Sequence, residues 1–123
     1  MKKANFNLSL NIEKAEKNKV EYSNWRKKNF DYKLGFFIIF QSFRDKYILK
    51  KISGGALKLY LYLSTFINND TGECWVTINR IAEYFEINQR TASNWLKELE
   101  RLNLIERIQF KPKEPAHTYF KPY

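Results

Sequence analysis

The sequence has few of the residue types from which metal sites, disulfides and catalytic centres are built. Its 123 residues include one cysteine, Cys74, and one histidine, His117. A lone cysteine cannot form an intrachain disulfide, and a zinc site needs more cysteine or histidine ligands than these two residues supply. No nucleophile with its base, no glycine-rich phosphate loop and no paired-carboxylate motif is recognisable. We therefore expect no enzyme activity, no metal, no cofactor and no small-molecule substrate.

Long apolar runs and helix-breaking residues are also scarce. No run approaches the roughly 18–20 apolar residues of a membrane-spanning helix, and no apolar segment of a secretion signal follows the basic start of the chain. We therefore expect a cytoplasmic protein with no membrane partner. There are only four glycines and three prolines. All three prolines lie near the C-terminus, where they disfavour helices.

Positive charge is what the sequence has in excess. Lys and Arg number 22 against 13 Asp and Glu, which gives a net charge of +9 and a pI of about 9.6. An excess of this size favours a polyanionic partner, with nucleic acid first and a membrane surface second. Hydrophobic residues make up 44% of the chain. This is enough apolar material for the core of one ordinary domain.

The first 34 residues are the hardest part of the chain to interpret. Near the start, apolar and polar residues alternate over residues 6–12, which is the period-2 pattern of a strand. Residues 22–33 mix aromatic and cationic side chains, and we expect Tyr22 and Trp25 to pack in a core rather than to stack on nucleic acid. We treat residues 1–34 as a basic N-terminal extension of uncertain structure.

The folded domain is predicted to begin at residue 35 and to run to residue 123. Residues 35–40, with the sequence GFFIIF, are bulky and β-prone and predict a buried leading strand. Residues 42–49 fit a short helix. Ser53 is a good N-cap for a helix over residues 54–67 that is apolar on most sides and therefore buried.

The rest of the chain shows clear start and stop signals. Thr77 and Asn88 are N-caps for two further helices, and Asn103 suits the left-handed position that follows a helix. We expect Cys74 to be a small buried hydrophobic residue and His117 to be a surface turn residue. The predicted elements after the first helix are a turn at 68–72, a strand at 74–76, helices at 78–85 and 89–102, and strands at 104–110 and 118–123.

Two short helices separated by a turn of about three residues form a helix-turn-helix arrangement. In this arrangement the second helix presents its N-terminal residues to base edges in the major groove. Arg reads guanine, Asn and Gln read adenine, and Ser or Thr reaches bases or phosphates. The candidate DNA-binding residues of this helix are Asn88, Gln89, Arg90, Thr91, Ser93, Asn94 and Lys97.

The two final strands are expected to form a hairpin that acts as a wing. Its tip carries Lys111 and Lys113 between two prolines and suits the phosphate backbone or the minor groove. Thr77 and Arg107 are expected to support this contact from the neighbouring elements. A basic arm made of Lys2, Lys3, Arg26, Lys27 and Lys28 is a further candidate for DNA contact.

These motifs carry a family resemblance over residues 53–123. The stretch from Gly72 to Thr77 (GECWVT), the helix opening Asn88-Gln89-Arg90-Thr91 and the exit Asn103-Leu104-Ile105 resemble winged helix-turn-helix domains of bacterial plasmid and phage replication initiators and of mobile-element regulators. The resemblance implies an α+β fold, a winged helix-turn-helix with a three-helix core, a small antiparallel sheet and a hairpin wing, preceded here by the N-terminal extension. It also implies binding of double-stranded DNA in replication, maintenance or transcriptional regulation.

Two positions depart from the family pattern. Glu86 stands where the turn between the helices usually has glycine, and a left-handed non-glycine residue costs about 1–2 kcal/mol. The turn is therefore expected to change shape. Trp95 occupies a position that is often small, and we expect it to pack under the wing.

Two other functions remain open at this point. The domain could be a protein-interaction or assembly module of a replication or conjugation complex. Alternatively, the aromatic and basic N-terminal region could bind single-stranded DNA. For the duplex-binding interpretation we expect a homodimer, because one such domain reads only a few base pairs and specificity usually comes from paired half-sites.

The charge is distributed unevenly between the extension and the domain. Residues 1–52 contain 13 Lys and Arg against 5 Asp and Glu, whereas residues 53–123 contain 9 against 8. The predicted base-reading motif is therefore almost neutral, and most of the electrostatic affinity must come from the first 52 residues or from local clusters.

Deletion of residues 1–34 tests this division. We expect a lower affinity for DNA and a shallower salt dependence, because fewer counterions are released from the phosphates. Fluorescence anisotropy with the full and shortened chains at two salt concentrations measures both quantities. If affinity and salt slope are unchanged, the basic arm is not a binding element.

Overall fold

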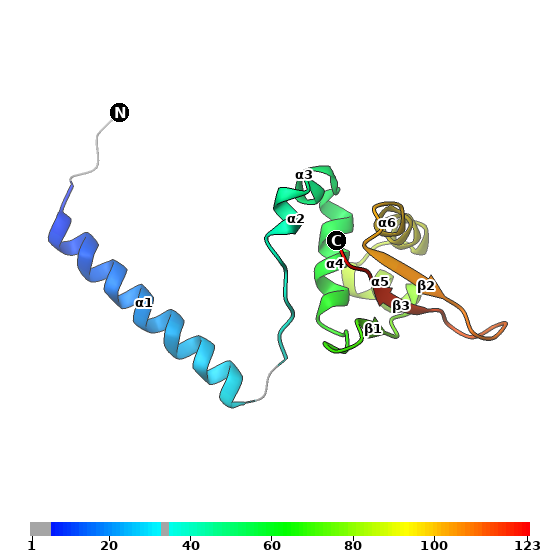
Figure 1. The fold of residues 1–123 in the computed structure, drawn as a ribbon, viewed down its shortest axis with the longest axis horizontal. Coiled ribbons are helices and arrows are strands. Elements are labelled where there is room, and N and C mark those ends of the chain that lie inside the picture. Colours follow the sequence, from blue (N-terminus) through cyan, green and yellow to red (C-terminus); the bar gives the residue numbers. More distant parts are fainter. Residues whose placement is uncertain (1–5, 33–34) are drawn as a thin grey trace. The chain divides into compact units, whose positions relative to one another are not determined.

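The computed structural model describes residues 6–32 and 35–123 (Figure 1). The chain divides into two compact units, Met1–Phe36 and Phe37–Tyr123. In chain order the elements are α1 (Leu8–Asp31), α2 (Ser42–Asp45), α3 (Ile48–Lys51), α4 (Gly54–Ser64), β1 (Glu73–Cys74), α5 (Ile78–Phe85), α6 (Gln89–Arg101), β2 (Ile105–Ile108) and β3 (His117–Phe120).

The first unit is built around one long helix, so the strand expected over residues 6–12 is wrong. The side chain of Asn7 accepts a hydrogen bond from the backbone N–H of Leu10, which caps the start of α1. The residues that follow are good helix formers, and the pair Lys17–Glu21 adds i,i+4 support. Four alternating residues were too short a pattern to outweigh these signals.

No residue of α1 is buried. Tyr22 and Trp25, which were expected in a core, are 61% and 60% exposed and contact each other with ring centroids 5.6 Å apart. This follows from the architecture, since the described residues of the first unit form one helix, which offers these rings no second layer to pack against. Lys2 and Lys3 lie outside the described residues.

Residues 35–40 do not form the predicted leading strand. They have no regular secondary structure, and Ile38 and Phe40 are 61% and 65% exposed. A β-prone run becomes a strand only beside a partner, and the sheet is built from other segments. The division between the two units falls inside this run, after Phe36. The short helix expected over residues 42–49 is replaced by α2 and α3, with Tyr47 in a left-handed conformation between them (φ 61°).

The second unit combines three packed helices with a small sheet. Strands β1, β3 and β2 form an antiparallel sheet in that order. Thr118 of the central strand β3 is paired with Cys74 of β1 on one side and with Arg107 of β2 on the other. Helices α4, α5 and α6 supply most of the core, so an α+β architecture is confirmed. The largest fully buried side chains are Leu59, Leu63, Ile81, Leu96, Leu99, Leu104, Ile105 and Val76.

Helix α4 buries one face through residues spaced as a helix requires. Ala56, Leu59, Tyr60 and Leu63 are all buried. The ring of Tyr60 stacks between Phe43 of α2 and Phe120 of β3, at centroid distances of 5.5 and 4.8 Å. Burial raises the pKa of Tyr60 well above its usual range. This ring stack joins the segment before α4 to the sheet.

Trp95 does not pack under the hairpin, as was expected from the sequence. Its ring lies edge-on to Phe85 of α5, with centroids 5.5 Å apart, and it also lies against Gly55 of α4. The reason is its position on the side of α6 that faces the other two helices. A side-chain carbon added at Gly55 would overlap the Trp95 ring, whereas one added at Gly54 would meet nothing within 4 Å.

Gly55→Ala is therefore expected to destabilise the domain by about 1–3 kcal/mol, the usual cost of overpacking. Gly54→Ala is the matched control and is expected to be neutral or stabilising, because alanine reduces the freedom of the unfolded chain. Urea unfolding followed by circular dichroism gives both free energies of unfolding. Equal effects of the two substitutions would contradict the close approach of Trp95 to α4.

Candidate nucleic-acid interface

Helices α5 and α6 are joined by the tight turn Glu86-Ile87-Asn88. Glu86 adopts the left-handed conformation itself (φ 54°, ψ 46°), so the turn is not reshaped to avoid it. The N–H of Ile87 donates to the carbonyl of Ala82 at 3.0 Å, which closes the end of α5. Ile87 packs against the core. Glutamate is therefore held in a conformation that costs about 1–2 kcal/mol.

Both helices begin with the side-chain caps predicted from the sequence. The side-chain oxygen of Asn88 accepts from the backbone N–H of Thr91 at 2.8 Å. The Thr77 hydroxyl accepts from the N–H of Arg80 at 3.2 Å. Because these oxygens are used within the protein, both residues position the helices, and any DNA contact they make must use their remaining polar groups.

The outward side of α6 carries a row of polar side chains. Arg90, Asn94, Lys97 and Arg101 are exposed and follow one another at i, i+4, i+7 and i+11, which places them on one face. Of the other predicted residues, Gln89 is exposed, while Thr91 and Ser93 are half-buried. The opposite face is buried through Ala92, Leu96 and Leu99. Arg101 extends the row beyond the predicted residues, because the helix-turn-helix pattern indicates base contacts only from the N-terminal end of the second helix.

Asn79 is a second residue that was not anticipated. The side-chain amide of Gln89 donates to the side-chain oxygen of Asn79, near the start of α5. This contact joins the N-terminal turns of the two helices. A signal was present in the sequence, because Asn79 is a polar residue in the first turn of the helix that Thr77 caps.

The hairpin of β2 and β3 carries its two lysines at the end of a long loop. The side chain of Gln109 donates to the carbonyl of Glu114 at 2.9 Å, and the N–H of Glu114 donates to the carbonyl of Lys111 at 3.2 Å. Lys111 and Lys113 are exposed, and Lys113 is left-handed (φ 67°). Figure 1 shows this loop extending away from the three helices.

Arg107 has a different environment from these lysines. It is half-buried on β2, and its Nε is buried with no hydrogen-bond partner among the described residues. Burial lowers the pKa of the guanidinium, an effect that the charge of Glu100 opposes. Arg107 is therefore set back toward the core and is not brought together with the lysines of the loop.

The base of the hairpin holds a polar cluster that the sequence did not reveal. The indole N–H of Trp75 donates to His117 Nε2 at 2.8 Å, and His117 Nδ1 lies 3.4 Å from a carboxylate oxygen of Glu73. His117 opens β3 and is half-buried, so its assignment to a surface turn is wrong. His117 is paired with Ile108 of β2 in the antiparallel sheet, so it belongs to the strand and not to the connection before it.

Cys74 behaves as predicted. It is 1% exposed, and burial raises the pKa of its thiol to about 11. Among the described residues no group of three or more His, Cys, Asp and Glu side chains is arranged to hold a metal ion. In the same part of the chain no helix has the length and hydropathy needed to span a membrane.

Two groups of basic residues before α4 are candidates for DNA contact. Arg26, Lys27 and Lys28 are exposed near the end of α1, where Arg26 lies over the ring of Phe30 at 5.8 Å. Four further cations, Arg44, Lys46, Lys50 and Lys51, belong to the second unit and precede α4. The second unit is therefore more basic than residues 53–123 alone.

Residues 50–105 match a family model described as a helix-turn-helix domain. The match covers α4, β1, α5 and α6 and ends at the first residue of β2, so the rest of the hairpin lies outside it. Comparisons with curated proteins and with solved structures give no match.

Asn88, the N-cap of α6, and Asn94 within the helix give a test of the capping geometry. Asn88→Ala is expected to lower the free energy of unfolding by about 1 kcal/mol, since one backbone N–H of α6 loses its partner. Asn94→Ala serves as the control and is expected to leave stability within about 0.5 kcal/mol of the wild type, because its side chain is exposed. Chemical denaturation measures both, and an equal loss for the two variants would contradict the cap.

Proposed function

We propose that the chain is a sequence-specific binder of double-stranded DNA, because residues 50–105 match a family model described as a helix-turn-helix domain. The observation that carries the proposal is the row Arg90, Asn94 and Lys97 on the exposed side of α6. An arginine can bond the two major-groove acceptors of guanine, and an asparagine matches the donor and acceptor of adenine. The buried opposite face of α6 holds this row rigidly outward.

Contacts to the DNA backbone come from the surrounding elements. Thr77 sits at the N-terminus of α5, where backbone N–H groups and the helix dipole favour a phosphate. The hairpin acts as a wing, and Lys111 and Lys113 at its exposed loop reach a phosphate or the minor groove. Arg107 supports the hairpin from its half-buried position. These contacts fix orientation, while the row on α6 reads sequence.

Electrostatic affinity requires more charge than the helix-turn-helix itself carries. Residues 53–123 contain 9 Lys and Arg against 8 Asp and Glu. The basic segment before α4 and the cluster Arg26, Lys27 and Lys28 on α1 supply the additional cations. Each phosphate contact releases counterions, so binding weakens as salt rises.

The biological setting is inferred from the family resemblance. We place the protein in the cytoplasm, as a homodimer that reads paired half-sites in plasmid or mobile-element replication or maintenance, or in transcriptional regulation. The proposal includes no catalytic step, no metal and no cofactor.

A second candidate is the binding of single-stranded DNA by α1. Tyr22 and Trp25 are exposed beside Arg26, Lys27 and Lys28. Aromatic rings stack on unpaired bases, with about 1–3 kcal/mol per base. A third candidate, a protein-assembly module, is favoured by the near-neutral charge of residues 53–123.

Arg90→Ala tests direct readout by α6. It is expected to reduce the preference for the specific site by about 1–3 kcal/mol and to weaken non-specific binding much less. Arg101→Ala removes the same charge from the last turn and is the matched control; it should weaken both kinds of binding by similar factors. Fluorescence anisotropy with upstream DNA of the same gene and with random duplex gives the ratio of variant to wild-type affinity for each kind of DNA. Equal loss of both in Arg90→Ala would argue against base reading by this helix.

The same titration with random single strands separates the candidates. Duplex DNA is expected to compete more strongly than single-stranded DNA, and affinity should fall with salt. Stronger single-strand binding would favour α1 as the binding element, and no salt-dependent binding would favour the assembly module.

A further inference from the structure

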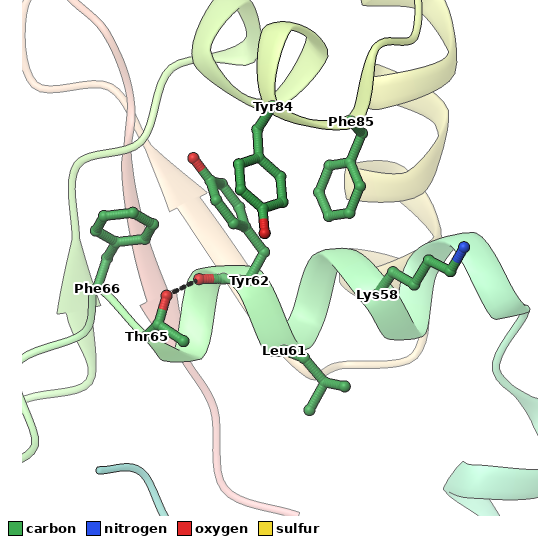
Figure 2. A pocket seen from close by; sticks show the side chains of 7 residues that line it. All are labelled: Lys58, Leu61, Tyr62, Thr65, Phe66, Tyr84 and Phe85. Carbon is green, nitrogen blue, oxygen red and sulfur yellow. Dashed lines mark hydrogen bonds between the residues drawn. The ribbon is translucent and has the colours of Figure 1, made fainter. Parts of the chain in front are cut away.

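An apolar surface lies along α4 and includes none of the residues of the polar row on α6. A groove of about 410 Å³ lies between α4 and α5 (Figure 2). A second groove of about 360 Å³ lies between α4 and residues 39–49. Leu61 lines both grooves, and Figure 2 shows it pointing away from α5, so the two form one continuous area. We call this area the α4 surface.

The α4 surface is unusually apolar for an exposed region. Phe40 is 65%, Tyr84 64%, Ile39 45% and Leu61 38% exposed. Only two charged side chains, Arg44 and Lys58, line the grooves, and Arg44 lies 3.1 Å from Asp45. Single exposed apolar residues are ordinary, but a contiguous group of this kind marks an interaction site.

The segment that borders the second groove has an unused preference for β structure. The sequence of residues 35–40 predicts a buried strand, yet residues 37–40 belong to no strand of the described structure. The backbone N–H of Phe40 instead donates to the hydroxyl of Tyr123 at 2.9 Å. The sequence pattern predicts that these side chains are buried, but a single copy of the chain leaves them exposed. A second molecule that covers them would account for the difference.

We propose that the α4 surface binds the same surface of a second copy of this chain. The surface carries both a groove and protruding side chains, so a twofold axis lets Phe40 of each copy enter the groove of the other. Such an isologous contact closes on itself as a dimer. DNA does not fit this site, because the grooves lack the rows of cations that phosphates require.

The area available is consistent with a stable dimer. Large aromatic side chains bury about 150–250 Å² each, and the surface also includes Phe66, Leu49 and Leu57. At exposed fractions of 65%, 64% and 39%, the rings of Phe40, Tyr84 and Phe66 alone offer roughly 250–420 Å², a substantial part of the roughly 800 Å² per partner of a specific interface. Lys58 lines the first groove of each copy, so like charges meet at the interface and salt should strengthen the dimer by screening them.

This inference rests on the proposed function in one respect, since paired half-sites require two copies. None of the groove residues belongs to α6 or to the hairpin. The dimer contact and the DNA contact therefore use different side chains. This separation allows the two proposals to be tested independently.

The test is sedimentation velocity of the full chain without DNA, at low and high salt. Phe40→Asp and, as a second variant, Leu61→Asp place a carboxylate in the apolar area and are expected to weaken self-association by roughly 30-fold or more. Tyr47→Asn is the matched control, because Tyr47 is 64% exposed but lines neither groove. Asparagine also tolerates its left-handed conformation. Thermal melts verify that all variants fold.

A dimer in the wild type and in Tyr47→Asn, strengthened by salt and lost in the two Asp variants, supports the proposal. A monomeric wild type, or dimers that persist in both folded Asp variants, would overturn it. A monomeric wild type whose DNA affinity falls in Phe40→Asp would assign the surface to DNA and equally overturn it. Binding of random duplex by monomeric Phe40→Asp tests DNA binding without the dimer. Failure of the dimer proposal can therefore be distinguished from failure of the DNA-binding proposal.

Discussion

The packing of α4 against α6 is the constraint on which the second unit depends. Small and branched side chains, Ala56 and Leu59 on one helix and Ala92 and Leu96 on the other, are completely or almost completely buried. Gly55 lets the ring of Trp95 lie directly against α4. Since one face of α6 is committed to this contact, the rotation of the helix about its axis is set. Its polar face must then point outward, which makes it available to a partner.

Short-range geometry at the helix ends completes this arrangement. Glu86 and Asn103 both adopt left-handed conformations, and each ends a helix so that the chain turns back over the core. Asn88 and Thr77 satisfy backbone N–H groups at the starts of α6 and α5. The turn thus places the N-terminal end of α6 beside the start of α5, where Gln89 and Asn79 meet. Burial therefore determines which face of α6 points outward, and the caps and turns determine where the helix begins and ends.

Several elements were predictable because their signals are local. The bounds of α5 agree with the prediction, α6 ends one residue earlier, and Asn103 is left-handed as expected. Other elements were mistaken where the outcome depends on distant partners. The GFFIIF run is β-prone but pairs with no strand in the described part of the chain, and Trp95 faces two helices rather than the hairpin. The hydrogen bond between Trp75 and His117 joins residues 42 positions apart, and no local pattern indicates it.

By itself the sequence determined the caps, the helix-turn-helix spacing, the hairpin and the uneven charge, because each depends on residue types within a few positions of one another. Only the tertiary structure decided which side chains of α6 are free, since that requires knowing which face α4 covers. It also decided that Arg107 is partly withdrawn from solvent and that apolar side chains around Phe40 remain uncovered. Burial is a property of the assembled layers, and a pattern in the chain can indicate a need for burial without showing what provides it.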